Sequence, residues 1–72
     1  MKVISTTDLS RYGNDCYIYE SISLTEQFGL YAIINFCKVT GWAEREEVSM
    51  MKHTTDINEA KKYYQFYGGI LE

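Results

Sequence analysis

The sequence predicts an α+β domain: a three- or four-stranded antiparallel sheet, arranged as a meander, with one C-terminal helix packed on one face. Residues 28–39, FGLYAIINFCKV, are mostly apolar and rich in β-branched and aromatic side chains, which is typical of a central strand buried on both sides. A second strand-like segment, 16–24, precedes it, and a capping motif near Asp56 begins a helical pattern. A chain of 72 residues has room for a single domain, 1–72.

The N-terminal part is predicted to be a short edge strand followed by a loop. Residues 1–5 favour the strand, and residues 6–15 are mostly Thr, Asp, Ser, Gly and Asn, which are typical of turns. Residues 16–24 then alternate between a largely apolar face and a face carrying Tyr17 and Tyr19, which predicts a strand. Residues 25–27 form the expected loop to the central strand.

The register of this hairpin follows from matching apolar faces. Pairing Leu24 with Phe28 aligns the apolar side chains of the two strands over their whole length. A one-residue slip would set Cys16 opposite Cys37 and permit a cross-strand disulfide. We favour the first register because several matched apolar pairs outweigh one thiol contact in a reducing cell.

The segment 42–53 is predicted to return as a further strand. Gly41 supplies a turn that places it directly beside the central strand. A helix over 42–52 is the alternative, because Glu, Arg, Met and Lys favour helices. The register is left open; pairing Ala43 with Val39 is attractive because it sets opposite charges and apolar side chains against each other.

The C-terminal helix has the clearest local signal. Asp56 is a good N-cap, and Glu59 three residues later completes a capping box. The helix is expected over 57–67 and ends at the glycine pair 68–69. Residues 70–72 are an apolar tail that can fold back onto the sheet. The inward face of the helix is predicted to consist of Ile57, Ala60, Tyr63, Tyr64 and Tyr67.

Composition excludes several classes of function. The net charge of −3 lacks the dense basic patch of a nucleic-acid-binding protein, so no direct nucleic-acid partner is expected. No apolar run reaches about 18 residues, and the first four residues are too short for a signal sequence, so no membrane partner is expected. Cys16 and Cys37 form neither a disulfide framework nor a zinc-binding spacing. We expect a cytoplasmic protein with two reduced thiols.

No catalytic, cofactor-binding or metal-binding set is apparent, so the chain is not expected to be an enzyme or to bind a cofactor. His53 is the only histidine, and the strand pairing separates it from Cys37. The glycine pair 68–69 follows a helix, whereas phosphate-binding glycines precede one. The carboxylates in 44–47 lack the spacing of a calcium loop. An enzyme subunit would need a pocket completed by a partner chain.

The predicted interface is one face of the sheet. In the favoured register Tyr17, Tyr19, Tyr31, Ile33 and Cys37 share a face, and the single helix is assigned to the opposite one. An apolar patch of several hundred Å² is unusual on a monomer. The face is therefore expected to bind a protein, unless the N-terminal segment or the tail covers it. Stacking on nucleic-acid bases is disfavoured because these strands carry few basic residues.

Glu44, Glu46 and Glu47 form the second predicted contact region. They can be a solvated strand end that discourages stray pairing, or an acidic patch that imitates nucleic-acid phosphates, although Arg45 weakens such a patch. The resulting hypothesis is a non-enzymatic inhibitor or adaptor of a phage or mobile element, of the anti-CRISPR or nuclease-inhibitor type, acting on a basic nucleic-acid-binding protein. This step relies on analogy of size and charge. The alternative is a homo-oligomeric structural or regulatory subunit, such as a homodimer, that self-associates through the Tyr17/Tyr19/Tyr31 face.

Overall fold

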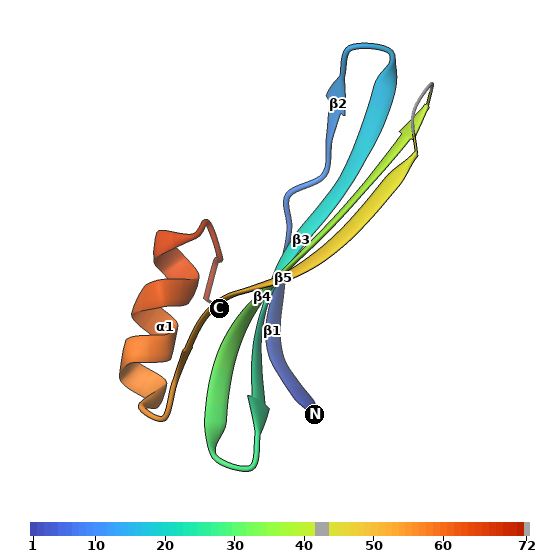
Figure 1. Ribbon diagram of the computed structural model, residues 1–72. Helices are drawn as coiled ribbons and strands as arrows, with labels where there is room; N and C mark the ends of the chain where they lie inside the picture. The colour runs from blue at the N-terminus through green and yellow to red at the C-terminus, as the bar shows by residue number, and fades with distance from the viewer. Residues whose placement is uncertain (42–43, 72) are drawn as a thin grey trace.

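The computed structural model describes residues 1–41 and 44–71, and within them one helix packs on a single antiparallel sheet (Figure 1). The sheet has the order β1-β3-β4-β5, and the short β2 pairs with β3. The predicted α+β class and the C-terminal helix are confirmed, whereas the described residues form five strands instead of three or four. The elements are β1 (Lys2–Asp8), β2 (Arg11–Gly13), β3 (Cys16–Gln27), β4 (Leu30–Gly41), β5 (Arg45–Thr54) and α1 (Ile57–Phe66).

The additional strand is β2, and it arises because the edge predicted to end at residue 5 continues, with an interruption, to Gly13. β1 and β2 pair with opposite halves of β3, and Leu9 and Ser10 lie between them. The Leu9 N–H donates to the Glu20 carbonyl (2.7 Å), and the Ser10 hydroxyl accepts from the Glu20 N–H (3.1 Å). The loop predicted over 6–15 is therefore mostly wrong, since threonine and serine fit an edge strand as well as a turn.

The β3–β4 hairpin turns at Phe28 and Gly29, three residues later than the start of the predicted loop. Both residues have positive φ, 53° and 80°, as a type I′ hairpin turn requires. Leu24 consequently pairs with Ile33, and Glu20 pairs with Cys37. Both registers considered from the sequence are wrong. The physical reason is that this two-residue turn matches the right-handed twist of the strands.

The shift in register exchanges the two faces of β4. Because opposed residues share a face, Leu24 lies with Ile33 on the side of α1, which we call the covered face. Ile34, predicted to lie beneath the helix, is on the other side, which we call the open face. The core between α1 and the covered face consists of Ile22, Leu24, Ile33, Ala60 and Tyr64.

The strand predicted over 42–53 is confirmed for its described part, which is β5 (Arg45–Thr54) and not a helix. Its register differs by two residues from the one considered attractive: Val39 pairs with Arg45, and Lys38 pairs with Glu46. A two-residue shift keeps the side chains from Arg45 to Met50 on the same face, so opposite charges still meet at Lys38. A bulge follows at Ile33/Ile34. Trp42 and Ala43, predicted to begin this strand, lie outside the described residues.

The helix begins as predicted and ends within one residue of the prediction. Asp56 accepts from the Asn58 N–H (2.8 Å). The predicted capping box is not formed: the Asp56 N–H donates to the Thr54 hydroxyl (3.1 Å), and Glu59 accepts from that hydroxyl instead (2.9 Å). Gly68, with φ of 101°, follows the end of the helix. The hydrogen bonds of Thr54 connect the end of β5 to the first turn of α1.

The helix covers only part of one face of an elongated molecule measuring 41 × 21 × 15 Å (Figure 1). It contacts β3, β4 and β5, while the sheet near β2 extends well beyond it. The predicted tail folds back: the Ile70 N–H donates to the Thr7 hydroxyl (2.9 Å), and Leu71 packs against the core. This tail lies on the helix side of β1, so the open face remains uncovered by it.

Candidate protein-binding face

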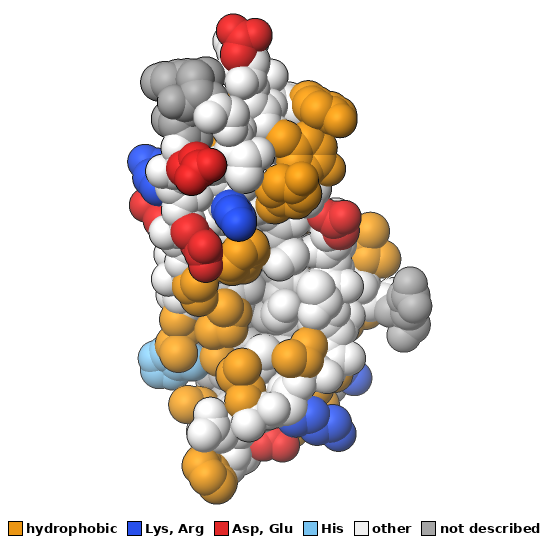
Figure 2. Space-filling view, turned by 90° about the vertical axis from the view of Figure 1, so that its right-hand side faces the viewer, with side chains coloured by type: hydrophobic (Ala, Val, Ile, Leu, Met, Phe, Trp, Pro, Cys, Tyr) orange, Lys and Arg blue, Asp and Glu red, His pale blue; other side chains and the backbone are white. Residues whose placement is uncertain are grey.

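The open face carries a broad set of exposed apolar side chains. No element in residues 1–41 and 44–71 packs over this face (Figures 1 and 2). Strand pairing decides which side chains share it, because directly opposed residues lie on the same side of a sheet. Its larger side chains include those of Tyr12, Tyr17, Tyr19, Ile34, Phe36, Lys38, Glu46, Val48 and Met50.

Three tyrosines form a ladder at the β2 end of the open face. The ring centroids of Tyr12 and Tyr17 lie 4.6 Å apart at 73°, and those of Tyr17 and Tyr19 lie 4.3 Å apart at 65°. These edge-to-face contacts fix the rings relative to one another. Tyr12 is nevertheless 85% exposed. The ladder is thus an ordered aromatic surface that remains accessible to solvent.

A second apolar group lies along β4 and β5. Val48 and Met50 are 65% and 57% exposed, and they stand opposite half-buried Phe36 and Ile34. Figure 2, which views the side of the sheet away from α1, shows hydrophobic side chains in separate groups with charged side chains near them. Lys38 and Glu46 are opposed in the register next to this group.

The structure brings together only part of the predicted tyrosine set. Tyr17 and Tyr19 lie on the open face as expected. Tyr31 and Ile33 lie on the covered face, where Tyr31 packs against the core and Ile33 is 1% exposed. Cys37 is also on the covered face, opposite Glu20. The cause is the register of the β3–β4 hairpin, which determines the side of β4 that faces α1.

The three predicted carboxylates are all exposed but do not form one surface. Alternation along β5 places Glu46 on the open face and Glu47 on the covered face. The Arg45 Nε lies 3.9 Å from Glu47 Oε1, which partly offsets the negative charge there. A contact made by the open face would therefore include Glu46 without Glu47.

Phe28 is a candidate contact residue, although the sequence pattern predicts it to lie inside a strand. It lies at the tip of the β3–β4 hairpin, is 96% exposed, and has a φ of 53°. Positive φ is uncommon for a bulky residue, and such strained positions cluster at functional sites. Gly29 is the sequence signal that could have located this turn, because glycine is favoured at the second position of a two-residue hairpin turn.

A polar cluster lies on the covered face beyond the helix. The Arg11 guanidinium pairs with the Glu20 carboxylate, which also accepts from Asn35 Nδ2 (3.0 Å). These hydrogen bonds, that of Arg11 above all, lower the pKa of Glu20. Glu20 is therefore ionised at neutral pH. Its carboxylate connects β3 to Arg11 on β2 and to Asn35 on β4, which is a structural role.

A metal site or a catalytic pair among the described residues would point to a chemical function. In residues 1–41 and 44–71 there is no group of three His, Cys, Asp or Glu side chains arranged to hold a metal ion. His53 is exposed opposite Ala32, whereas Cys37 lies opposite Glu47, several positions along β4.

Comparisons with known proteins do not place the chain in a family. No protein-family model, curated protein or solved structure gave a significant match to it. Among the described residues, no helix is long and apolar enough to cross a membrane.

Proposed function

We propose that this chain is a non-enzymatic protein-binding module that acts by burying its open face against another protein. The observation that carries the proposal is the exposed apolar surface of Tyr12, Tyr19, Val48 and Met50. These side chains are 85%, 48%, 65% and 57% exposed and lie in two groups on one sheet face, which is more exposed apolar surface than scattered single residues give. A sheet face of this kind is more stable when another protein removes it from water.

The composition of the face supports a protein partner. Tyrosine, phenylalanine and methionine are enriched at protein interfaces, whereas the centre of an interface is depleted in charge. The tyrosine ladder loses little conformational freedom on binding because its rings already contact one another. Phe28 projects from one end of the molecule as a further side chain suited to a partner's pocket.

The form of function we propose is that of an inhibitor or adaptor acting on a basic nucleic-acid-binding protein, of the anti-CRISPR or nuclease-inhibitor type. Its support is the small size and the net charge of −3, which favours encounter with a basic surface. The separation of Glu46 from Glu47 favours recognition through the apolar open face, with the carboxylates at its margin.

Binding of purified basic nucleases, CRISPR effectors among them, tests this proposal. Tyr19→Ser with Val48→Lys should weaken binding by about tenfold or more, because both substitutions change the open face. Phe66→Ser is the matched control: Phe66 is an exposed aromatic residue on α1, away from that face. Equal binding by the double variant and the wild type, or binding to none of these enzymes, would contradict the proposal.

Self-association through the same face is the second candidate, and the opposed Lys38 and Glu46 favour it. A two-fold axis parallel to the strands and between β4 and β5 would set Lys38 of each copy against Glu46 of the other. The same operation would set Phe36 against Val48. About 800 Å² per partner is typical of a stable interface, so the contact would have to extend over both apolar groups of the open face.

Light scattering with a charge swap distinguishes this candidate. Lys38→Glu or Glu46→Lys alone should dissociate the dimer by placing like charges together, and the double swap should restore it. A wild-type monomer at tens of micromolar would exclude self-association as the function and leave a different partner for the open face.

A further inference from the structure

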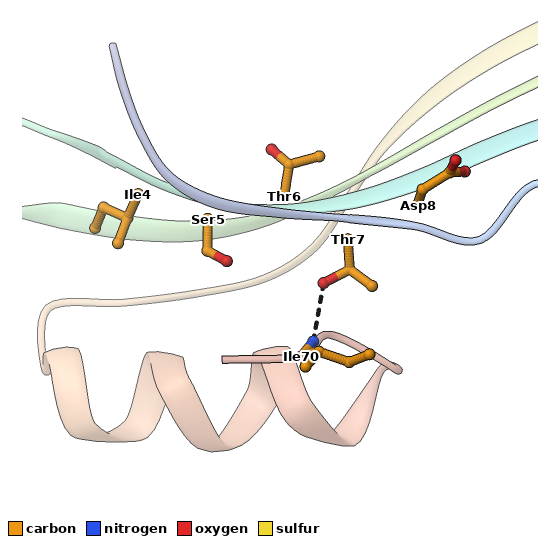
Figure 3. Close-up of a pocket in the computed structure, with 6 residues that line it drawn as sticks. All are labelled: Ile4, Ser5, Thr6, Thr7, Asp8 and Ile70. Atoms are coloured by element: carbon orange, nitrogen blue, oxygen red, sulfur yellow. Dashed lines mark hydrogen bonds between the residues drawn. The ribbon is translucent and has the colours of Figure 1, made fainter. Parts of the chain in front are cut away.

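A groove runs beside the free edge of β1, away from the open face. Two adjoining hollows of about 480 and 320 Å³ lie between this strand and the chain that follows α1. Residues 4–8 of β1 and Ile70 line the first hollow (Figure 3). The second is lined by Ile4, Ser5, Lys61 and Leu71.

Backbone groups of β1 face this groove. The Leu9 N–H donates to the Glu20 carbonyl, which shows that the amide of Leu9 points toward β3. The backbone N–H groups of successive residues point to alternate sides of a strand, so those of Ser5 and Thr7 also point toward β3. Those of Thr6 and Asp8 point outward. A strand edge of this kind is a template for pairing with another extended segment.

The two outer edges of the sheet differ in how strongly they discourage such pairing. The β5 edge carries Arg45, Glu46 and Glu47 in succession, and charge along an edge strand opposes the addition of a strand. Uncharged stretches occur on both edges, 4–7 of β1 and 48–51 of β5, but only the stretch on β1 borders these two hollows. β1 is therefore the edge at which an added strand would also find a groove for its side chains.

The groove is held in place by a hydrogen-bond network beneath β1. The Tyr64 hydroxyl lies 2.6 Å from the Thr7 hydroxyl and 3.2 Å from that of Ser5. The Thr7 hydroxyl also accepts from the Ile70 N–H (2.9 Å), which fixes the tail that forms the opposite wall (Figure 3). Such preorganisation lowers the entropy cost of binding.

We propose that this groove binds an extended peptide segment of a partner protein as an additional strand beside β1, with a carboxylate of the segment at Lys61 and uncharged residues beside Asp8. Backbone groups of Thr6 and Asp8 pair with the segment. An apolar side chain fills the hollow between Ile4 and Ile70, and a carboxylate meets the ammonium group of Lys61. This site is separate from the open face and does not depend on the function proposed for that face.

A labelled seven-residue peptide that alternates threonine and valine, with a single glutamate at the end that lies beside Lys61, is a suitable probe for fluorescence anisotropy. Thr6→Pro should weaken its binding by about tenfold or more, because proline removes an outward N–H without breaking the ladder to β3. Thr6→Val keeps that N–H and should bind like the wild type. Methylation of alternate backbone nitrogens of the peptide should abolish binding even if Thr6→Pro fails to fold.

Charge variants test the orientation of the peptide. Lys61→Glu should weaken binding, whereas Lys62→Glu, on the same helix but away from both hollows, should not. Val48→Lys on the open face should also leave peptide binding unchanged, which separates this site from the proposed function. Absence of binding to the wild type, or equal binding by Thr6→Pro, would overturn the proposal.

Discussion

Replacing Phe28 by asparagine is expected to stabilise the protein, although it removes a large apolar side chain. Phe28 occupies the first central position of the β3–β4 turn with a φ of 53°, and its side chain is 96% exposed. Left-handed backbone costs an ordinary L-residue roughly 1–2 kcal/mol, whereas asparagine tolerates it. Little packing is lost at such exposure, so Phe28→Asn should raise the unfolding free energy by about 1 kcal/mol.

Urea unfolding followed by circular dichroism measures this change. A gain of about 1 kcal/mol corresponds to a rise in Tm of roughly 4–8 °C for a chain of this size. The slope of free energy against urea should stay constant, because the buried area is unchanged. Gly29→Ala, in the same turn at a φ of 80°, is the control and should lower stability.

The same substitution also tests why phenylalanine occupies this position. If Phe28 is a contact residue, Phe28→Asn should weaken partner binding while stabilising the free protein, as expected where function retains a strained residue. A loss of stability in Phe28→Asn would refute this reasoning, because it would show that the aromatic ring packs against the protein and contributes more than the turn costs.

Three further substitutions probe the contacts that hold the sheet together. Tyr64→Phe should lower the unfolding free energy by about 1–2 kcal/mol, measured in urea, because it removes a buried hydroxyl contact; no measurable loss would contradict the role of that network. Gly69→Ala should cost about 1–3 kcal/mol in the same assay, since a Cβ there would lie 2.5 Å from the Tyr64 ring; a variant as stable as the wild type would show that the ring can move. Arg11→Gln should change the pH dependence of Tm. The pKa of Glu20 is lowered from its ordinary value of 4.5, so the pair contributes stability above that pH, and this stability is lost as pH falls through the folded pKa. The decline in Tm between about pH 5 and pH 3 should therefore be shallower in Arg11→Gln, and an unchanged curve would show that the pair does not depress the pKa.

Local sequence signals predicted the C-terminal helix well. Its start depends on Asp56, which accepts from an N–H only two residues away, and its end depends on glycines that directly follow it. Such contacts join neighbours in the chain, so the sequence specifies them without the rest of the fold. The fold-back of the tail was also foreseen, but its hydrogen bond to Thr7 was not.

Part of the candidate site was also predictable. Tyr17 and Tyr19 lie on the open face because alternation along a strand follows directly from sequence. Tyr12 was missed because threonine, serine and asparagine around it indicated a loop, whereas β2 continues the edge of the sheet. Val48 was recognised as apolar, but its face depended on pairing with β4.

The sequence by itself determined the class of the fold, the apolar character of β4 and the caps of α1. Only the tertiary structure decided which face of β4 the helix covers. Both faces of that strand are apolar, so hydrophobic pattern could not distinguish Ile33 from Ile34. The choice depended on a turn at Phe28 and Gly29, where two residues with positive φ join strands of the correct twist. Compared with the predicted pairing of Leu24 with Phe28, that turn shifts the register by an odd number of residues. The shift buries Ile33 beneath α1 and leaves Ile34 on the open face.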